Sequence, residues 1–289
     1  MRKSVVFIFI LFGSFNTLVS QSFEAYQVYN SSGERVDFNQ VVSASSESDV
    51  VLFGELHNSP ICHWLQLELA KSLILKEKPV ALGAEMFETD DQVVINEYLN
   101  GFITLSHLQK EAKVWPNFKT DYLPLLELAK ASQLPFVATN VPRRYASLMS
   151  KRGMTGLDSL SKESRQFMPS LPFKVTEGDL GYAKMGEMMG MHMQGGMTNF
   201  IAAQALKDYT MAFNINKNLQ KKGTFIHFNG SFHSDLHAGI FNYLKSMNKG
   251  IEITTISAVE IEDVSEFQEE WKELGDFILV VSSSMTKTH

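Results

Sequence analysis

The chain has 289 residues, a formal net charge of −6 and a single cysteine. A mildly acidic chain without basic clusters argues against a nucleic-acid partner. One cysteine excludes an internal disulfide, so the fold must be stabilised by its apolar core, for which the chain is long enough.

Residues 1–20 have the layout of a secretory signal peptide. Arg2 and Lys3 are followed by an apolar run over residues 5–12, and then by small and polar residues up to Ser20. A transmembrane helix needs about 20 apolar residues, and this run is roughly half as long. We therefore expect cleavage after Ser20, no stable membrane span afterwards, and a periplasmic or secreted protein. Cys62 lies far from that point, so a lipoprotein anchor is not expected.

Residues 21–48 are polar and Ser-rich, and we interpret them as a lead-in to a domain over residues 49–289. Apolar, β-branched runs then predict strands at residues 49–54, 79–84, 134–139, 224–228, 251–257 and 277–281. Helical patterns separate these runs, which indicates a mostly parallel sheet with helices on both faces. The predicted fold is a three-layer α/β fold. A closed barrel would need eight such units, more than the sequence offers.

The segment at about residues 150–197 fits no strand–helix unit, and we predict that it forms an inserted helical cap. Tyr182, His192 and a run of methionines lie close together in it. Methionine is flexible and polarizable, and it suits irregular apolar surfaces. A flat apolar ligand such as haem needs such a surface together with an axial Tyr, His or Met. A Met-rich helix that only packs over the sheet explains the same pattern.

Polar side chains follow several of the predicted strands. The first strand runs into Glu55 and His57, the second ends at Glu85, the third is followed by Arg143, and the fourth by His233. In parallel α/β sheets, ligands bind where the strands end at their carboxyl edge. These side chains therefore predict a pocket at that edge of the sheet.

The residue types in this set allow more than one chemistry. Glu55 and His57 are two residues apart, so in an extended chain their side chains point to the same side. Such a carboxylate can share a metal with the imidazole or orient it as a general base. With Glu85 and His233 they form a ligand set that suits zinc, manganese or iron. Alternatively, Glu55 caps a helix and His57 is a turn residue, while His63 forms either a pocket wall or the core edge.

Short motifs occur in a fixed order along the chain: GELHNSP at 54–60, EMF at 85–87, DYLPLL at 121–126, NVPR at 140–143, AQALKD at 203–208 and NGSFH at 229–233. Together they resemble the ChaN-like family of iron-regulated, haem-binding proteins, within the wider Tiki/TraB and erythromycin-esterase-like superfamily. The resemblance covers residues 49–244, and the order and spacing of the motifs make it fairly specific.

The resemblance implies an α/β fold with a helical insertion and haem bound in the periplasm or at the outer membrane. It also implies a homodimer in which two porphyrins stack and tyrosine is the iron ligand. No motif locates that tyrosine; Tyr182 is the first candidate and Tyr209 the second. His192, His63 and Arg143 are further candidates for contact with haem.

The same superfamily contains hydrolases, some of them dependent on a divalent metal. In that alternative His57 would be the general base or a metal ligand, Glu55 would orient it, and Glu85 and His233 would complete the catalytic set. Arg143 could then hold an anionic group of the substrate. We therefore expect an exported protein that binds haem, or another small molecule, in haem or iron uptake or handling; the alternative is a metal-dependent hydrolase of peptidase or esterase type.

Overall fold

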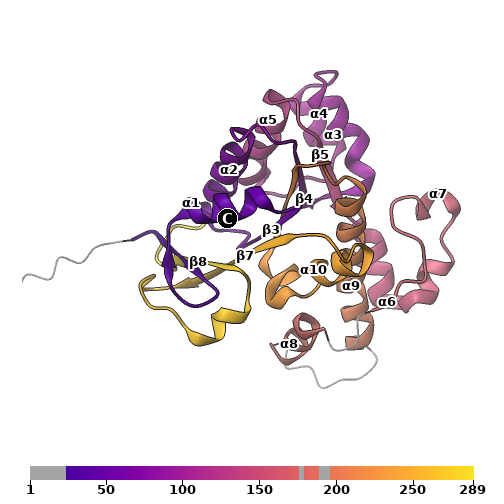
Figure 1. The fold of residues 1–289 in the computed structure, drawn as a ribbon. Coiled ribbons are helices and arrows are strands. Elements are labelled where there is room, and N and C mark those ends of the chain that lie inside the picture. The colour runs from indigo at the N-terminus through magenta and orange to yellow at the C-terminus, as the bar shows by residue number, and fades with distance from the viewer. Residues whose placement is uncertain (1–23, 176–178, 189–195) are drawn as a thin grey trace, which may run out of the picture.

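The computed structural model describes residues 24–175, 179–188 and 196–289 (Figure 1). The predicted signal peptide of residues 1–20 lies outside these ranges. At the centre is an eight-stranded sheet in the order β2-β1-β8-β7-β3-β6-β4-β5. Within the described ranges, no helix has both the length and the apolar composition that crossing a bilayer requires.

The strands are β1 (Tyr26–Asn30), β2 (Arg35–Val36), β3 (Val50–Glu55), β4 (Val80–Glu88), β5 (Phe136–Asn140), β6 (Thr224–Gly230), β7 (Ile253–Ile261) and β8 (Phe277–Ser282). β1 is antiparallel to β2 and β8, and the other paired strands are parallel. The predicted strands are thus confirmed as β3 to β8, and so is the mostly parallel sheet. The segment 21–48, expected as a lead-in, contributes β1, β2 and a helix to the fold.

Helices cover both faces of this sheet, as predicted (Figure 1). One face packs against α1 (Phe38–Glu47), α2 (Pro60–Ile74), α3 (Gln92–Leu99), α4 (Leu105–Glu111) and α5 (Leu123–Ala131). The other packs against α6 (Arg143–Asp158), α9 (Gly196–Lys217) and α10 (Ile240–Met247). The remaining helices of the described residues are α7 (Lys162–Arg165), α8 (Leu180–Met188), η1 (Thr89–Asp91), η2 (Phe118–Tyr122), η3 (Ser231–His233), η4 (Asp235–His237) and η5 (Glu269–Glu273).

The central strand β3 explains why both faces must be covered. All of its residues are buried, and successive side chains alternate between the faces. Val51 and Phe53 pack in the cluster that contains α2, whereas Val50 and Leu52 pack in the cluster that contains α9. An apolar strand without alternation is therefore stable only between two helical layers.

The segment expected as a helical cap contains the end of α6, the helices α7 and α8, and the start of α9. Leu157, Met168 and Phe173 from this segment are buried in the same apolar cluster as the core residues of α9. The described part of the cap thus packs on the helical layer that covers one face of the sheet.

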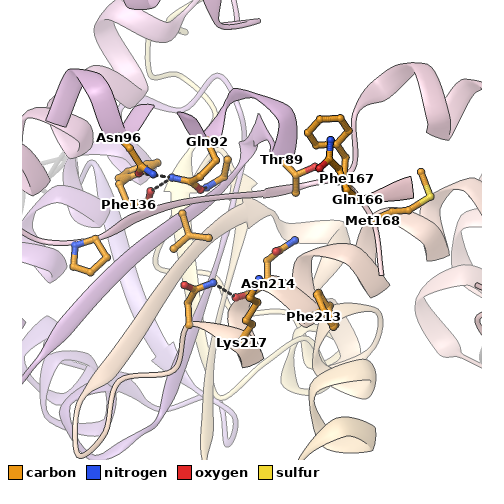
Figure 2. A pocket seen from close by; sticks show the side chains of 14 residues that line it. Thr89, Gln92, Asn96, Phe136, Gln166, Phe167, Met168, Phe213, Asn214 and Lys217 are labelled. Carbon is orange, nitrogen blue, oxygen red and sulfur yellow. Dashed lines mark hydrogen bonds between the residues drawn. The ribbon is translucent and has the colours of Figure 1, made fainter. Parts of the chain in front are cut away.

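On the outer side of the edge strand β5, a side chain forms hydrogen bonds with the backbone in place of a further strand. Gln92 Nε2 donates to the Phe136 carbonyl at 2.9 Å, and Gln92 Oε1 accepts from the Ala138 amide at 2.7 Å. Gln92 lines a cavity of about 350 Å³. Figure 2 shows its side chain next to Asn96, to which Gln92 Nε2 also donates at 2.9 Å. An edge strand with unpaired backbone groups is a template for pairing with another chain. Gln92 occupies two of these backbone groups.

We expect Gln92→Ala to lower the free energy of unfolding by about 1–3 kcal/mol, because buried backbone groups of Phe136 and Ala138 lose their partner. The variant should also self-associate at high concentration. Urea unfolding and light scattering measure the two effects. Asn96→Ala is the matched control, since Asn96 bonds to Gln92 but not to the strand. Equal behaviour of the two variants would show that the edge does not need this amide.

Candidate functional site

Adjacent strands bring the predicted site residues to one edge of the sheet. β3, β6, β4 and β5 are consecutive in the sheet, and they end at Glu55, Gly230, Glu88 and Asn140. A pocket of about 540 Å³ opens at these carboxyl ends. Its lining combines imidazoles, carboxylates, cations and apolar side chains: His57, Glu85, Met86, Glu88, Val114, Trp115, Pro116, Asn140, Val141, Arg143, Gln204, Lys207, Phe232 and His233.

Glu55 and His57 form a hydrogen-bonded pair, in agreement with their spacing. His57 Nδ1 lies 2.8 Å from Glu55 Oε1, which also accepts from the Tyr122 hydroxyl at 2.8 Å. Gln66 Nε2 donates to Glu55 Oε2 at 2.6 Å. Glu55 is buried, whereas the His57 side chain is 38% exposed and lines the pocket. The buried carboxylate therefore fixes the orientation of an imidazole that a ligand can reach.

The proton affinity of His57 is set by its neighbours. Burial disfavours the charged imidazole, but the hydrogen bond to Glu55 and the charge of Glu85 outweigh it, so the pKa of His57 is raised. A carboxylate that accepts from Nδ1 leaves Nε2 as the nitrogen available to a ligand or a proton. The pair thus has the arrangement of a general base, or of an imidazole ready to bind a metal-containing cofactor.

The backbone at the end of β6 approaches the His57 ring so closely that position 230 has room only for glycine. A Cβ atom there would lie 2.8 Å from His57 Nε2. The backbone angles of Gly230, φ −55° and ψ 137°, suit any residue, so the need is for space. The Gly230 amide also donates to Glu85 Oε2 at 2.8 Å. The end of β6 thus contacts both halves of the site.

A second chain of buried polar groups is centred on His233. Its Nε2 lies 3.1 Å from Glu85 Oε1, and its Nδ1 lies 2.5 Å from Asp208 Oδ1. The Tyr182 hydroxyl donates to Asp208 Oδ2 at 2.5 Å. Both ring nitrogens of His233 therefore face carboxylates, and α8 is tied to the site through Tyr182.

These contacts fix the charge of His233. Burial disfavours the imidazolium, yet the charges of Glu85 and Asp208 raise the pKa of His233 to about 10. Burial opposes the ionised form of Glu85, but attraction to His233 prevails and the pKa of Glu85 is lowered. Burial raises the pKa of Asp208, although the positive charge of His233 partly offsets this rise. His233 is thus an imidazolium at neutral pH, with no lone pair for a metal or a proton.

The predicted metal centre at Glu55, His57, Glu85 and His233 is not supported. In residues 24–175, 179–188 and 196–289, no group of three or more His, Cys, Asp or Glu side chains is arranged to hold a metal ion. The reason is that these side chains satisfy one another. His233 lies between carboxylates, and His57 Nδ1 is bonded to Glu55.

His63 lies behind the Glu55–His57 pair and is buried. Its Nε2 is 3.1 Å from the His57 carbonyl and 3.3 Å from Asp121 Oδ2. Asn117 Nδ2 donates to the same carbonyl at 3.2 Å and to Asp121 at 2.6 Å, and Asp121 also accepts from the Thr288 hydroxyl at 2.8 Å. This network holds the backbone of His57, so His63 is placed to support the pocket and does not line it.

The structure places the tyrosine candidates away from the pocket lining. Tyr182 is 4% exposed, and burial together with Asp208 raises the pKa of its hydroxyl. The Tyr209 ring stacks on Phe173 with ring centroids 5.2 Å apart. His192 lies outside the described residues.

Cationic and aromatic side chains complete the pocket. Arg143 lines it with a side chain that is 64% exposed, and its Nε donates to Glu88 Oε1 at 2.5 Å. Lys207 also lines the pocket. The Trp115 ring meets the His57 ring edge-on, with centroids 5.0 Å apart. Imidazole, indole and two cations are therefore available to the same ligand.

Sequence reasoning did not identify Asp208, Gln66, Trp115 or Lys207 as site residues. Asp208 carries two signals: it ends the motif at 203–208, and it is an acid in a helical stretch of alanine and leucine, where an unpaired carboxylate would be costly. Gln66 lies three residues after His63, on the same helix face. Lys207 belongs to the motif at 203–208, but nothing local distinguishes Trp115, which long-range packing alone brings to the strand ends.

Comparison with known proteins agrees with the sequence motifs. The family model described as "Haem-binding uptake, Tiki superfamily, ChaN" matches residues 41–244, which is well over half of the chain. No curated protein matches the sequence.

Solved structures with the same fold include a ChaN protein. ChaN of Campylobacter jejuni, solved with cofacially bound haem, has a TM-score of 0.67 and 14% identity over 89% of this chain and 96% of its own. A succinoglycan biosynthesis protein has a TM-score of 0.54 and 10% identity over 89% and 94% of the two chains. An erythromycin esterase variant in its open conformation has a TM-score of 0.47 and 12% identity over 89% and 83%. The first two share the α/β fold, and the family match assigns this chain to the ChaN family of haem-binding uptake proteins in the Tiki superfamily.

Proposed function

We propose that this chain is an exported haem-binding protein that takes part in haem or iron uptake or handling. The observation that carries the proposal is the composition of the pocket at the strand ends. Apolar side chains, an accessible imidazole and two cations line the same cavity of about 540 Å³. Haem has an apolar ring, an iron that takes an axial ligand and anionic propionates. The family match supports the same ligand.

The residues of the pocket fit the parts of a haem. Trp115 and Phe232 offer aromatic surface for the porphyrin, and His57 would hold the iron through Nε2. Arg143 and Lys207 would pair with the propionates. Bound iron would supply the redox and ligand-binding chemistry of the haem. The Glu55 carboxylate, bonded to Nδ1, would strengthen His57 as a ligand. A proton on His57 Nε2 would compete with the iron, so the affinity for haem would fall at low pH.

The test is a titration of the purified mature chain with hemin, followed by the visible spectrum. We expect saturation at stoichiometric hemin. His57→Ala should weaken binding about tenfold or more and change the Soret band, because the side chain that would hold the iron is removed. His107→Ala is the matched control, since His107 is an exposed histidine on α4.

A tyrosine variant distinguishes the ligand candidates. Tyr182→Phe should leave the spectrum of the ferric complex unchanged, because the Tyr182 hydroxyl is buried on Asp208. Unchanged hemin binding in His57→Ala, or a changed spectrum in Tyr182→Phe, would overturn the assignment of His57. A titration without saturation would overturn the haem proposal itself.

Gel filtration with and without hemin tests the proposed homodimer, and N-terminal sequencing of the exported protein tests cleavage after Ser20.

One observation favours a second candidate function, hydrolysis by general-base catalysis. The Glu55–His57 pair combines a fixed Nδ1 contact of 2.8 Å, a raised pKa of His57 and an accessible ring. This arrangement can activate a water molecule for attack on an ester or amide. A hydrolase would cleave ester or peptide substrates, and His57→Ala would abolish that activity. The absence of turnover across both substrate classes, with hemin bound at stoichiometry, would exclude this candidate.

A further inference from the structure

Two buried acceptor oxygens at the β4–β5 end of the pocket have no hydrogen-bond donor among the described residues. They are Glu88 Oε2 and Asn140 Oδ1. Glu88 and Asn140 are opposite each other in the paired strands, and they are 4% and 8% exposed. Both residues line the pocket. Buried acceptors in native proteins are nearly always paired, so this pair of oxygens marks a place where a ligand or water supplies donors.

The second polar atom of each side chain has a hydrogen bond, and these bonds show that the unpaired atoms are acceptor oxygens. Asn140 Nδ2 donates to the Glu85 carbonyl at 3.0 Å, so a flipped amide would place oxygen against oxygen. Glu88 Oε1 already accepts from Arg143 Nε at 2.5 Å. Glu88 Oε2 has Lys113 Nζ at 3.6 Å, which is too long for a hydrogen bond. Both open atoms are therefore acceptors, and they need N–H or O–H groups.

The charges around the two oxygens select the kind of donor. Arg143 and Lys113 already lie beside Glu88, so its charge does not call for another cation. Neutral hydroxyl groups satisfy both acceptors without adding charge. A haem offers nothing for this place, since its propionates are acceptors and its ring nitrogens bind iron. Met86 and Val141 line the same pocket and offer apolar surface for the carbon skeleton of a small ligand.

We infer that Glu88 and Asn140 form a subsite for adjacent hydroxyl groups of a small polyhydroxylated ligand. The two oxygens would each accept one hydroxyl hydrogen, while the exposed guanidinium of Arg143, whose Nε is bonded to Glu88, would donate from its other N–H groups to an oxygen of the same ligand. The subsite shares a pocket with the proposed haem site but does not depend on haem binding. It gives the pocket a second class of ligand, of the sugar or polyol type.

The experiment is a titration of the haem-free mature chain with glycerol, the smallest probe with adjacent hydroxyls. The side-chain amide signal of Asn140 in ¹H–¹⁵N NMR spectra reports on the subsite. We expect a saturable shift of this signal with glycerol. The matched probe 1,2,3-trimethoxypropane has the same skeleton without O–H donors, and it should cause no saturable shift.

A matched pair of variants tests the role of Glu88. Glu88→Gln keeps an oxygen for Arg143 and places an NH₂ group where the second acceptor stood, so glycerol binding should weaken about tenfold or more. Glu262→Gln, at an exposed position, should bind glycerol like the parent chain. The inference is overturned if glycerol gives no saturable shift, if both probes shift the signal equally, or if Glu88→Gln binds glycerol as tightly as the parent. Because no haem is present, the result is independent of the hemin titration.

Discussion

Asp208→Ala should lower the free energy of unfolding by about 3–5 kcal/mol, the range expected when one partner of a buried ion pair is removed. Asp208 is fully buried and accepts from His233 Nδ1 and the Tyr182 hydroxyl, each at 2.5 Å. Removal leaves an imidazolium and a phenol without their acceptor. It also lowers the pKa of His233, because one of the two carboxylates that stabilise its proton is gone.

Urea unfolding at neutral pH measures the effect on Asp208→Ala. Asp158→Ala is the control, because Asp158 is an exposed acid at the end of α6; its change should stay within about 0.5 kcal/mol. Asp208→Asn keeps an acceptor of the same shape without the charge, so its loss should be intermediate. A change below about 1 kcal/mol for Asp208→Ala would contradict a buried imidazolium at His233.

The part of the fold that local pattern predicts is the parallel core. Strands such as β3 are apolar and β-branched on both faces, and only burial between helical layers explains such a run. β1 could not be predicted in the same way. It is short and polar at its ends, and its position depends on antiparallel pairing with β8, which is more than two hundred residues away in the chain. A contact of that range leaves no local signal.

In the site, too, local spacing predicts some of the contacts, and long-range packing determines the others. Glu55 and His57 could be placed together, because a spacing of two in extended chain is a geometric rule. The strand ends could be assigned to one edge because parallel strands share a direction. Asp208 on α9 bonds to His233, and Tyr182 on α8 bonds to Asp208, and no periodicity predicts these long-range contacts. The expected assignment of His233 to a metal is not supported, because a second carboxylate, Asp208, occupies its other ring nitrogen.

The stability of the protein should depend on pH through two buried histidines with opposite shifts. The pKa of His233 is about 10 in the folded chain, against an ordinary value of 6.5. Below pH 6.5 both states hold this proton and the contribution of His233 is complete. As pH rises from 6.5 to 10, only the folded state keeps it, so stability falls by an amount on the order of 4 kcal/mol. Burial lowers the pKa of His227 to about 4, so His227 removes stability as pH falls from 6.5 to 4.

Urea unfolding at about pH 6.5, 8 and 9.5 should therefore show a free energy of unfolding that falls as pH rises. His233→Gln separates the two causes. It is expected to be less stable at every pH, because Glu85 and Asp208 lose their cation, and its decline on the alkaline side should be much smaller, with His57, whose pKa is also raised, as a remaining contributor. The contribution of His227 on the acid side should remain, since His227 keeps its bonds to Thr139 and Asn229; Asp235, whose pKa burial raises to about 6, opposes it there. An alkaline decline of the same slope in His233→Gln would assign it to other groups and would remove the imidazolium from the description of the site.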